Sequence, residues 1–159
     1  MLQSEYTKRR INVRAVIWKD GELLAVKHRS KEGIAPYYAV PGGGIDPMES
    51  LTECLKREIM EETGIEAKLG KLLFIQQFAS RRTGYDEELE FFYLVENPDD
   101  FVNIDLENTT HGHIEIAICE YADPKSVTLY PAFLQTIDIE KYITSDLPTL
   151  VVDNFHEQL

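Results

Sequence analysis

Runs of apolar residues along the chain are short and alternate in part with polar residues, which predicts a structure rich in β-strands. Residues 14–18 and 23–28 form two such runs, and the Asp20-Gly21 pair between them predicts a hairpin turn. Three later runs are further predicted strands: 72–78, 89–95 and 114–120, with residues 81–88 as a polar connection between the first two.

Helical periodicity is clearest between Ser50 and Glu62, where the chain has neither Gly nor Pro. Gly64 predicts the end of this helix, because glycine accepts a left-handed C-cap without a Cβ clash. Residues 33–47 are rich in Gly and Pro and predict a loop, and residues 133–142 are a second helix candidate. Strands and helices mixed in this order predict an α+β or α/β sandwich.

Three glutamates of the first helix lie on an unexpected side. On a helical wheel of about 100° per residue, Glu58, Glu61 and Glu62 continue the apolar stripe instead of opposing it. The stripe consists of Leu51, Cys54, Leu55 and Ile59, and the outward side carries Glu53, Lys56, Met60 and Thr63. The helix dipole disfavours anions near a C-terminus, and crowded carboxylates repel one another unless a cation neutralises them. Although most such clusters are solvated helix ends, this placement favours a site for Mg²⁺ or Mn²⁺, which prefer hard oxygen ligands.

The stretch Pro41-Gly42-Gly43-Gly44 directly precedes this helix. Without Cβ atoms, its peptide groups can approach a ligand or a metal closely. A Mg²⁺ ion held by few carboxylates usually bridges to substrate phosphates, so the combination predicts phosphoryl or pyrophosphoryl chemistry with an activated water.

Length and composition limit the classes of protein. With 159 residues the chain is predicted to form one domain, 1–159, and its net charge of −12 argues against a nucleic-acid partner. No apolar run is long enough for a membrane span or a signal peptide, so we expect a cytoplasmic protein with no membrane partner. Cys54 and Cys119 are too few for a disulfide framework or a four-ligand zinc site, and we expect buried, reduced thiols.

The charge is unevenly distributed along the chain. Residues 1–31 carry eight basic and three acidic side chains, whereas the remainder carries eight basic and 25 acidic ones. Either the clustering is a chance feature of a solvated surface, or the basic segment attracts an anionic ligand.

Residues 43–65 read GGIDPMESLTECLKREIMEETGI and resemble the Nudix box at every fixed position. The matching residues are Gly43, Glu49, Arg57, Glu58, Ile59, Glu61, Glu62, Gly64 and Ile65. A match of this length at fixed spacing is far more specific than a lone glycine-rich loop. The lead-in Tyr37-Tyr38-x-x-Pro41 is also similar to that family.

The resemblance implies an α/β/α sandwich around a mixed β-sheet, and Mg²⁺- or Mn²⁺-dependent hydrolysis of a nucleoside diphosphate linked to a further group. It implies that Glu58, Glu61 and Glu62 hold metal together with the Gly42 carbonyl, and that Arg57 and Glu49 pair to brace the loop. Glu61 or Glu62 would also orient or deprotonate the attacking water. Substrates that fit the family are ADP-ribose, nucleotide sugars, dinucleoside polyphosphates and (d)NTPs, and a homodimer is compatible with the resemblance.

Two features of the chain are not fixed by the family pattern. Met48 stands where many members have glycine, so the turn before Glu49 is expected to differ. The catalytic base is often a glutamate outside the box, and Glu115 is a candidate because it interrupts an isoleucine alternation on a predicted strand. An exposed strand residue is the alternative for Glu115, and the rival carboxylates are Glu87, Glu88, Glu90 and Glu120.

Basic residues near the glycine loop are candidates for contacts with a substrate diphosphate, although each taken alone fits an ordinary surface charge. They are Arg14, Lys27, His28, Arg29 and Arg81, with Arg82 as a further choice. Tyr37, Tyr38, Phe78 and Tyr85 are candidates for stacking on a base or for packing in the core. His111 and His113 have no third nitrogen or sulfur ligand nearby and are interpreted as loop residues.

Three other functions compete with hydrolysis. A nucleotide-sensing module of the same fold would be expected to carry a damaged box, and this box is intact. An isoprenoid diphosphate isomerase would require a placed acid or nucleophile, typically a cysteine, and Cys54 lies on the apolar stripe of the helix. A structural acidic domain would be indifferent to Mg²⁺ in its thermal stability.

Overall fold

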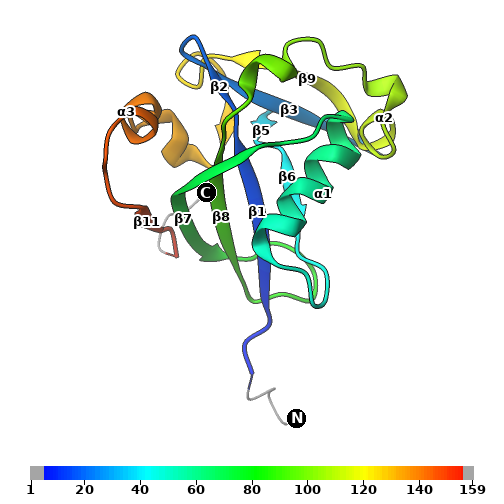
Figure 1. Ribbon diagram of the computed structural model, residues 1–159. Helices are drawn as coiled ribbons and strands as arrows, with labels where there is room; N and C mark the ends of the chain where they lie inside the picture. The colour runs from blue at the N-terminus through cyan, green and yellow to red at the C-terminus, as the bar shows by residue number, and fades with distance from the viewer. Residues whose placement is uncertain (1–5, 156–159) are drawn as a thin grey trace.

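A computed structural model describes residues 6–155 of the chain. Eleven strands in this part form two mixed sheets, one of five and one of six strands, and the helices pack around them (Figure 1). The expected α+β fold is confirmed, with the strands divided between two sheets.

The five-stranded sheet has the order β11-β7-β8-β1-β6. Its strands are β1 (Arg9–Val16), β6 (Gly42–Gly44), β7 (Leu69–Ala79), β8 (Glu87–Val95) and β11 (Leu150–Asp153). β1 pairs in parallel with β8, and β11 in parallel with β7, while the other two pairs are antiparallel.

The six-stranded sheet is built around β3, which pairs with four other strands. Its members are β2 (Trp18–Lys19), β3 (Glu22–Ser30), β4 (Gly33–Ile34), β5 (Tyr38–Ala39), β9 (Ile116–Ala122) and β10 (Leu129–Tyr130). The predicted hairpin is present between β2 and β3, where Asp20 and Gly21 have φ values of 51° and 81°. Such positive φ values at both central residues are typical of the tight turn that Asp-Gly favours.

Helix α1 (Leu51–Thr63) begins and ends where the sequence predicts. Ser50 Oγ accepts from the Glu53 backbone N–H at 3.1 Å, and Glu53 Oε2 accepts from the Ser50 N–H at 2.9 Å, which satisfies two otherwise orphaned donors. Gly64 ends the helix in the left-handed conformation. One outward residue was placed wrongly, because Thr63 is buried and its hydroxyl donates to the Ile59 carbonyl at 2.7 Å.

Three other predicted elements differ from the structure. The expected loop 33–47 contains the short strands β4, β5 and β6, since the chain there pairs with β1 and β3. The expected helix 133–142 is broken into a 3-10 turn, η3 (Ala132–Gln135), and α3 (Ile139–Thr144), because Asp138 caps a new helix start at Lys141 N–H. Two further 3-10 turns, η1 (Pro98–Phe101) and η2 (Leu106–Asn108), follow β8.

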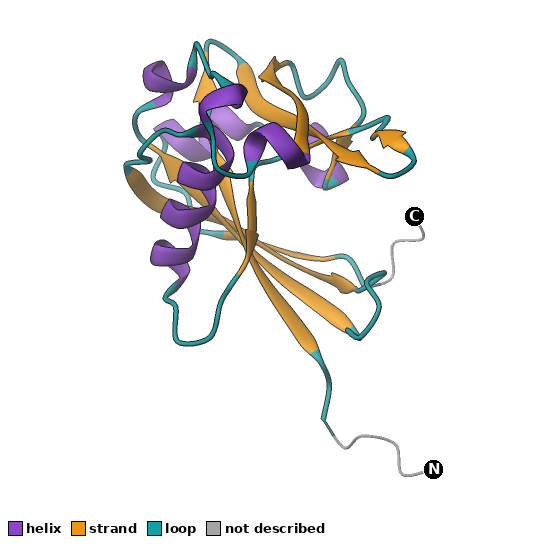
Figure 2. Cartoon of the chain, turned by 90° about the vertical axis from the view of Figure 1, so that its right-hand side faces the viewer, coloured by secondary structure: helices purple, strands orange, loops and turns teal. Residues whose placement is uncertain are grey.

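Two hydrophobic cores lie on opposite faces of the central strands. Val13 and Ala15 of β1 pack with Leu55 of α1, whereas Val16 packs with Phe133 and Ile139 from η3 and α3. Helices therefore cover both faces, as an α/β/α sandwich requires, and Figure 2 shows the five-stranded sheet extending beyond them. Within residues 6–155, no helix has the length and apolar character needed to cross a membrane.

Candidate active site

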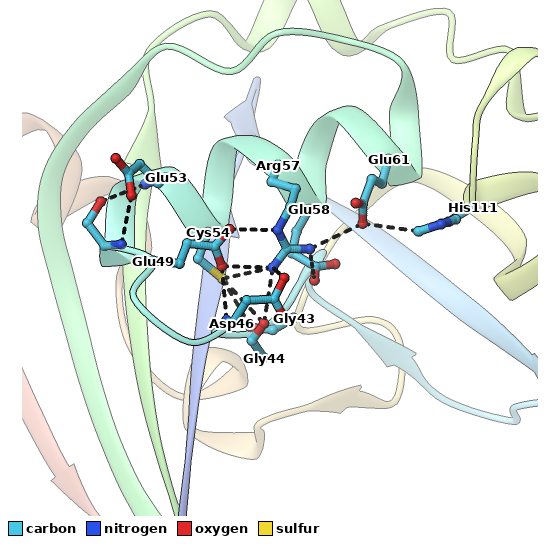
Figure 3. Close-up of polar contacts among 11 residues, drawn as sticks. Gly43, Gly44, Asp46, Glu49, Glu53, Cys54, Arg57, Glu58, Glu61 and His111 are labelled. Atoms are coloured by element: carbon cyan, nitrogen blue, oxygen red, sulfur yellow. Dashed lines mark hydrogen bonds and ion pairs between the residues drawn. The ribbon is translucent and has the colours of Figure 1, made fainter.

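Arg57 is the centre of the polar contacts on α1 (Figure 3). Its Nε and Nη2 donate to the two carboxylate oxygens of Glu49, at 2.7 and 2.9 Å, so the expected ion pair is present. Its Nη1 donates to Glu58 Oε1 at 2.9 Å and to Glu61 Oε2 at 3.3 Å. The hydrogen bonds from Arg57 lower the pKa of Glu49 to about 2. One guanidinium therefore joins the loop before α1 to two of the three glutamates that are expected to hold metal.

Glu62, the third of these glutamates, is buried against β6. Its Oε2 accepts from the Gly42 backbone N–H at 3.2 Å, and 2% of the residue surface is exposed. Gly42 has a φ of 141°, and a Cβ built there would lie 2.1 Å from the Val13 carbonyl oxygen. A Cβ at Gly43 would lie 2.4 Å from the Glu58 carboxyl carbon. Only glycine allows the backbone of β6 to lie so close to these carboxylates.

Burial and the repulsion between carboxylates disfavour the charged forms of two glutamates in this cluster. Burial raises the pKa of Glu62 to about 8, and the charge of Glu58 adds to the shift. The pKa of Glu58 is also raised, chiefly by burial. Carboxylate oxygens beside a glycine cradle are the donors that Mg²⁺ and Mn²⁺ prefer, so the residue types fit a divalent ion.

The carboxylates do not converge as they stand. Among residues 6–155, no three His, Cys, Asp or Glu side chains meet in a metal-binding group. Arg57 holds Glu58 and Glu61 by ion pairs, whereas Glu62 accepts a hydrogen bond from the Gly42 N–H. A bound ion would therefore share Glu58 and Glu61 with Arg57.

The segment before β9 packs against the C-terminal end of α1. The prediction that Glu115 lies on a strand is wrong: the N–H groups of Ile114 and Glu115 donate to the His111 carbonyl, both at 3.0 Å, and form the short helix α2 (Gly112–Glu115). The negative charge of Glu115 nevertheless contributes to the raised pKa of Glu62, and Gly112 of the same short helix lies against the Glu62 backbone carbonyl.

His111 contacts a box glutamate, which the sequence did not indicate. Its Nδ1 lies 3.0 Å from Glu61 Oε2, and its backbone N–H donates to the Glu61 carbonyl at 2.9 Å. These residues are 50 positions apart, and no sequence motif contains both of them.

A cavity of about 760 Å³, here called the sheet cavity, opens on the five-stranded sheet. Its polar lining includes Arg14, Gln76, Glu90 and Asn154, and aromatic side chains also line it. Arg14 connects it with the carboxylate cluster, because this residue pairs with Gly42 across β1 and β6. Burial opposes the charge of Arg14, but Glu90 and then Glu62 outweigh that effect and raise its pKa.

Three arginines of the basic N-terminal segment form ion pairs with β8. Because β1 and β8 are parallel neighbours, Arg9 pairs with Glu87, Arg10 with Glu88 at 3.5 Å, and Arg14 with Glu90 at 2.9 Å. The rival base candidates on β8 are thus engaged with arginines, and Glu120 accepts from the Tyr38 hydroxyl. Of these arginines, Arg14 lines the sheet cavity, and it donates to Glu90 through Nε.

The other candidate substrate contacts are divided by the fold. Arg81 lines the sheet cavity, whereas Lys27 lies over the Tyr38 ring, 4.7 Å from its centroid, and Arg29 is exposed where β3 pairs with β4. His28 is half-buried near Arg14 and Glu115, and burial lowers its pKa. The structure therefore brings Arg14 and Arg81 to the cavity but not Lys27 or Arg29.

Both cysteines are free thiols. Cys54 lies on the buried side of α1 and Cys119 is half-buried on β9. Burial raises the pKa of each thiol to about 12. An activated cysteine requires the opposite shift, toward the thiolate at neutral pH.

Comparison with known proteins adds independent findings. The family model described as "NUDIX domain" matches residues 8–135. The chain is 35% identical over 65 residues to CTP pyrophosphohydrolase of Escherichia coli K12, covering 41% of this chain and 48% of that protein. It is 41% identical over 88 residues to diphosphoinositol polyphosphate phosphohydrolase 2 of Rattus norvegicus, covering 54% and 47%. The chain thus spans about half the length of these two relatives.

The fold is shared with solved structures. The solution structure of the E. coli ORF135 protein matches with a TM-score of 0.66 at 22% identity, over 89% of this chain and 96% of that one. At that identity the likeness shows a common fold.

Proposed function

The chain belongs to the NUDIX domain family, and from this premise we propose that it is a divalent-metal-dependent pyrophosphohydrolase acting on a nucleoside diphosphate derivative. The observation that carries the proposal is the position of Glu62. This buried carboxylate accepts a hydrogen bond from Gly42 of the glycine strand β6. Gly42 pairs in turn with Arg14 of β1, which lines the sheet cavity.

Each group has a role that follows from its chemistry. Glu58, Glu61 and Glu62, with the carbonyl of Gly42, would hold Mg²⁺ or Mn²⁺. When bound, the ion supplies positive charge that stabilises the departing phosphate oxygen and makes water more acidic. Arg14 would bind the diphosphate, because a guanidinium offers several donors in a fork suited to phosphate, and Arg81 would assist from the cavity rim.

The reaction consumes one water molecule. Its oxygen forms a bond to one phosphorus, the bridging P–O bond breaks, and the electron pair of that bond leaves with the second phosphate. A carboxylate takes the proton of the water, and we propose Glu115 for this role because it is exposed and lies near Glu62. Arg57 and Glu49 hold the loop and α1 together and do not touch the reacting atoms.

Several features of the chain remain proposals alongside the activity. A single domain over 1–159 is supported by β11, which returns to pair with β7 of the central sheet. A cytoplasmic location, the absence of nucleic-acid and membrane partners, and formation of a homodimer stay predictions. The isomerase alternative finds no support at Cys54, whose thiol is buried and neutral.

A substrate panel tests the proposal. Release of phosphate-containing products from ADP-ribose, nucleotide sugars, dinucleoside polyphosphates and nucleoside triphosphates would be followed with Mg²⁺, with Mn²⁺ and with EDTA. We expect turnover of at least one compound that EDTA abolishes. Binding of a nucleotide without cleavage of any compound would support the sensing module instead.

A further inference from the structure

The last described residues of the chain form one wall of the sheet cavity, and they lie outside the family match. Resting on the proposed function, we propose that Asn154 and Phe155, the C-terminal wall, recognise the base of the substrate. The substrate is accordingly a nucleotide with its base in the sheet cavity, and not a polyphosphate that lacks a base.

The C-terminal wall is fixed to the central sheet by backbone contacts. β11 pairs with β7 up to Asp153, which lies opposite Gln77, and the Asn154 N–H then donates to the Gln77 carbonyl at 2.8 Å. The Phe155 N–H donates to Asp153 Oδ1 at 3.0 Å, which turns the chain after the strand. Asn154 and Phe155 are therefore presented at the cavity by an ordered strand end.

A row of hydrogen bonds joins this wall to the phosphate end of the cavity. Asn154 Nδ2 donates to Gln76 Oε1, and Gln76 Nε2 donates to Glu90 Oε1 at 3.0 Å. Glu90 Oε2 in turn accepts from Arg14 Nε at 2.9 Å. The row contains carboxylate and amide groups at a cavity surface, which is the chemistry that reads the hydrogen-bonding edge of a base.

The aromatic side chains that line the cavity suit a flat ring. Tyr37, Phe78, Tyr130 and Phe155 line the cavity, and the rings of Tyr37 and Tyr130 meet edge to face with centroids 5.0 Å apart. Aromatic side chains stabilise nucleobases by stacking on their faces.

The charge of the cavity argues against a polyphosphate head group. Its charged lining consists of Arg14, Arg81 and Glu90, and Glu90 already pairs with Arg14. A group with many phosphates would need several unengaged cations to replace its hydration. The similarity to a diphosphoinositol polyphosphate phosphohydrolase therefore does not extend to the chemistry of this cavity.

The test compares Phe155→Leu, Phe155→Ala and Asn154→Ala with Val151→Ala, a control on the preceding strand β11 whose side chain is exposed and does not line the cavity. Binding of AMP, GMP, CMP and UMP is measured by calorimetry in EDTA, after thermal melts establish that each variant is folded. We expect the wild type and Val151→Ala to bind at least one monophosphate equally well. Loss of the stacking ring should weaken that binding by about tenfold.

A second readout separates this inference from the proposed function. The ratio of kcat/KM for the best nucleotide to that for inorganic tripolyphosphate should fall at least about fivefold in the Phe155 variants. Two results would overturn the proposed role of the C-terminal wall and leave metal-dependent hydrolysis intact. One is that the wild type binds no monophosphate, and the other is that folded Phe155→Leu and Phe155→Ala bind it as tightly as the wild type does. Base binding that depends on Phe155, without hydrolysis of any compound, would support the wall and refute the hydrolase.

Discussion

Arg57 holds the carboxylate of Glu49 with two nitrogens, Nε to Oε2 at 2.7 Å and Nη2 to Oε1 at 2.9 Å. This two-point contact fixes the loop before α1 to the middle of the helix, while Nη1 remains for Glu58 and Glu61. The loop, the helix and the predicted metal ligands are thus coupled through one side chain.

Arg57→Lys should weaken both the fold and the site. An ammonium group cannot reproduce the planar fork, so we expect a loss of about 1–2 kcal/mol in unfolding free energy and a lower kcat. Urea denaturation and steady-state kinetics measure the two effects, with the exposed Lys56→Ala as a control on the same helix. An Arg57→Lys protein as stable and as active as the wild type would refute the bracing role.

Glu49 should make the protein acid-sensitive. Its folded-state pKa of about 2 lies below its ordinary value of 4.5, so the folded state binds the proton less readily than the unfolded chain. The stabilisation is present above pH 4.5 and is lost as the pH falls from there toward 2. Glu49→Gln should therefore lower the urea midpoint at pH 7 and change it little at pH 2.5. An equal decrease at both pH values would contradict the assignment.

Met48 should be replaceable by glycine with a gain in stability. It is fully exposed and has a φ of 64°, a conformation that costs a residue with a Cβ about 1–2 kcal/mol. Part of that gain is offset by the greater freedom of glycine in the unfolded chain, so Met48→Gly should stabilise by about 0.5–1 kcal/mol. Met48→Ala keeps the Cβ and serves as the control in thermal melts. A destabilised Met48→Gly would show that the turn is unstrained.

Glu115 should affect catalysis without affecting the fold if it accepts the proton of water. Its side chain is exposed, so Glu115→Gln should melt as the wild type does while kcat falls by at least about a hundredfold, the lower end of the range of general base catalysis. Glu120→Gln, an exposed carboxylate on β9, is the matched control. A decrease below about threefold would return Glu115 to the role of an ordinary surface residue.

A divalent ion should stabilise the folded protein through Glu62. Mg²⁺ or Mn²⁺ that binds the native state should raise the melting temperature in proportion to the logarithm of its concentration. Glu62→Gln removes a buried carboxylate that Glu58 repels, so this variant should melt no lower than the wild type in EDTA and gain little from the ion. An equal rise in the melting temperatures of both proteins would place the ion elsewhere.

Local patterns were sufficient to predict the box helix and its ends. Helical periodicity and Gly64 at the end of the helix are local signals, and Ser50 and Glu53, three residues apart, cap its start. The side of α1 that carries Glu58, Glu61 and Glu62 also follows from local periodicity. The left-handed conformation of Met48 was not predicted, because the missing glycine indicated only that this turn would differ.

Long-range pairing determines what the sequence did not reveal. Gln76 and Glu90 come from β7 and β8 and Asn154 directly follows β11, and no local pattern states that β11 returns to β7. Arg14 and Glu90 stand at alternating positions of two strands, a pattern typical of a solvated face until the parallel pairing of β1 and β8 is known. The contact between His111 and Glu61 likewise depends on how the segment before β9 packs on α1.

The most direct test of the central claim is the rate of P–O–P cleavage in wild type, Glu62→Gln and Glu53→Gln, measured with and without Mg²⁺ on the best compound of the panel. Glu53 is an exposed glutamate of the same helix, and glutamine preserves its capping contact. The account predicts Mg²⁺-dependent cleavage in wild type and Glu53→Gln, and a loss of at least about a hundredfold in Glu62→Gln. Cleavage by Glu62→Gln at the wild-type rate, with the same Mg²⁺ dependence, would contradict it.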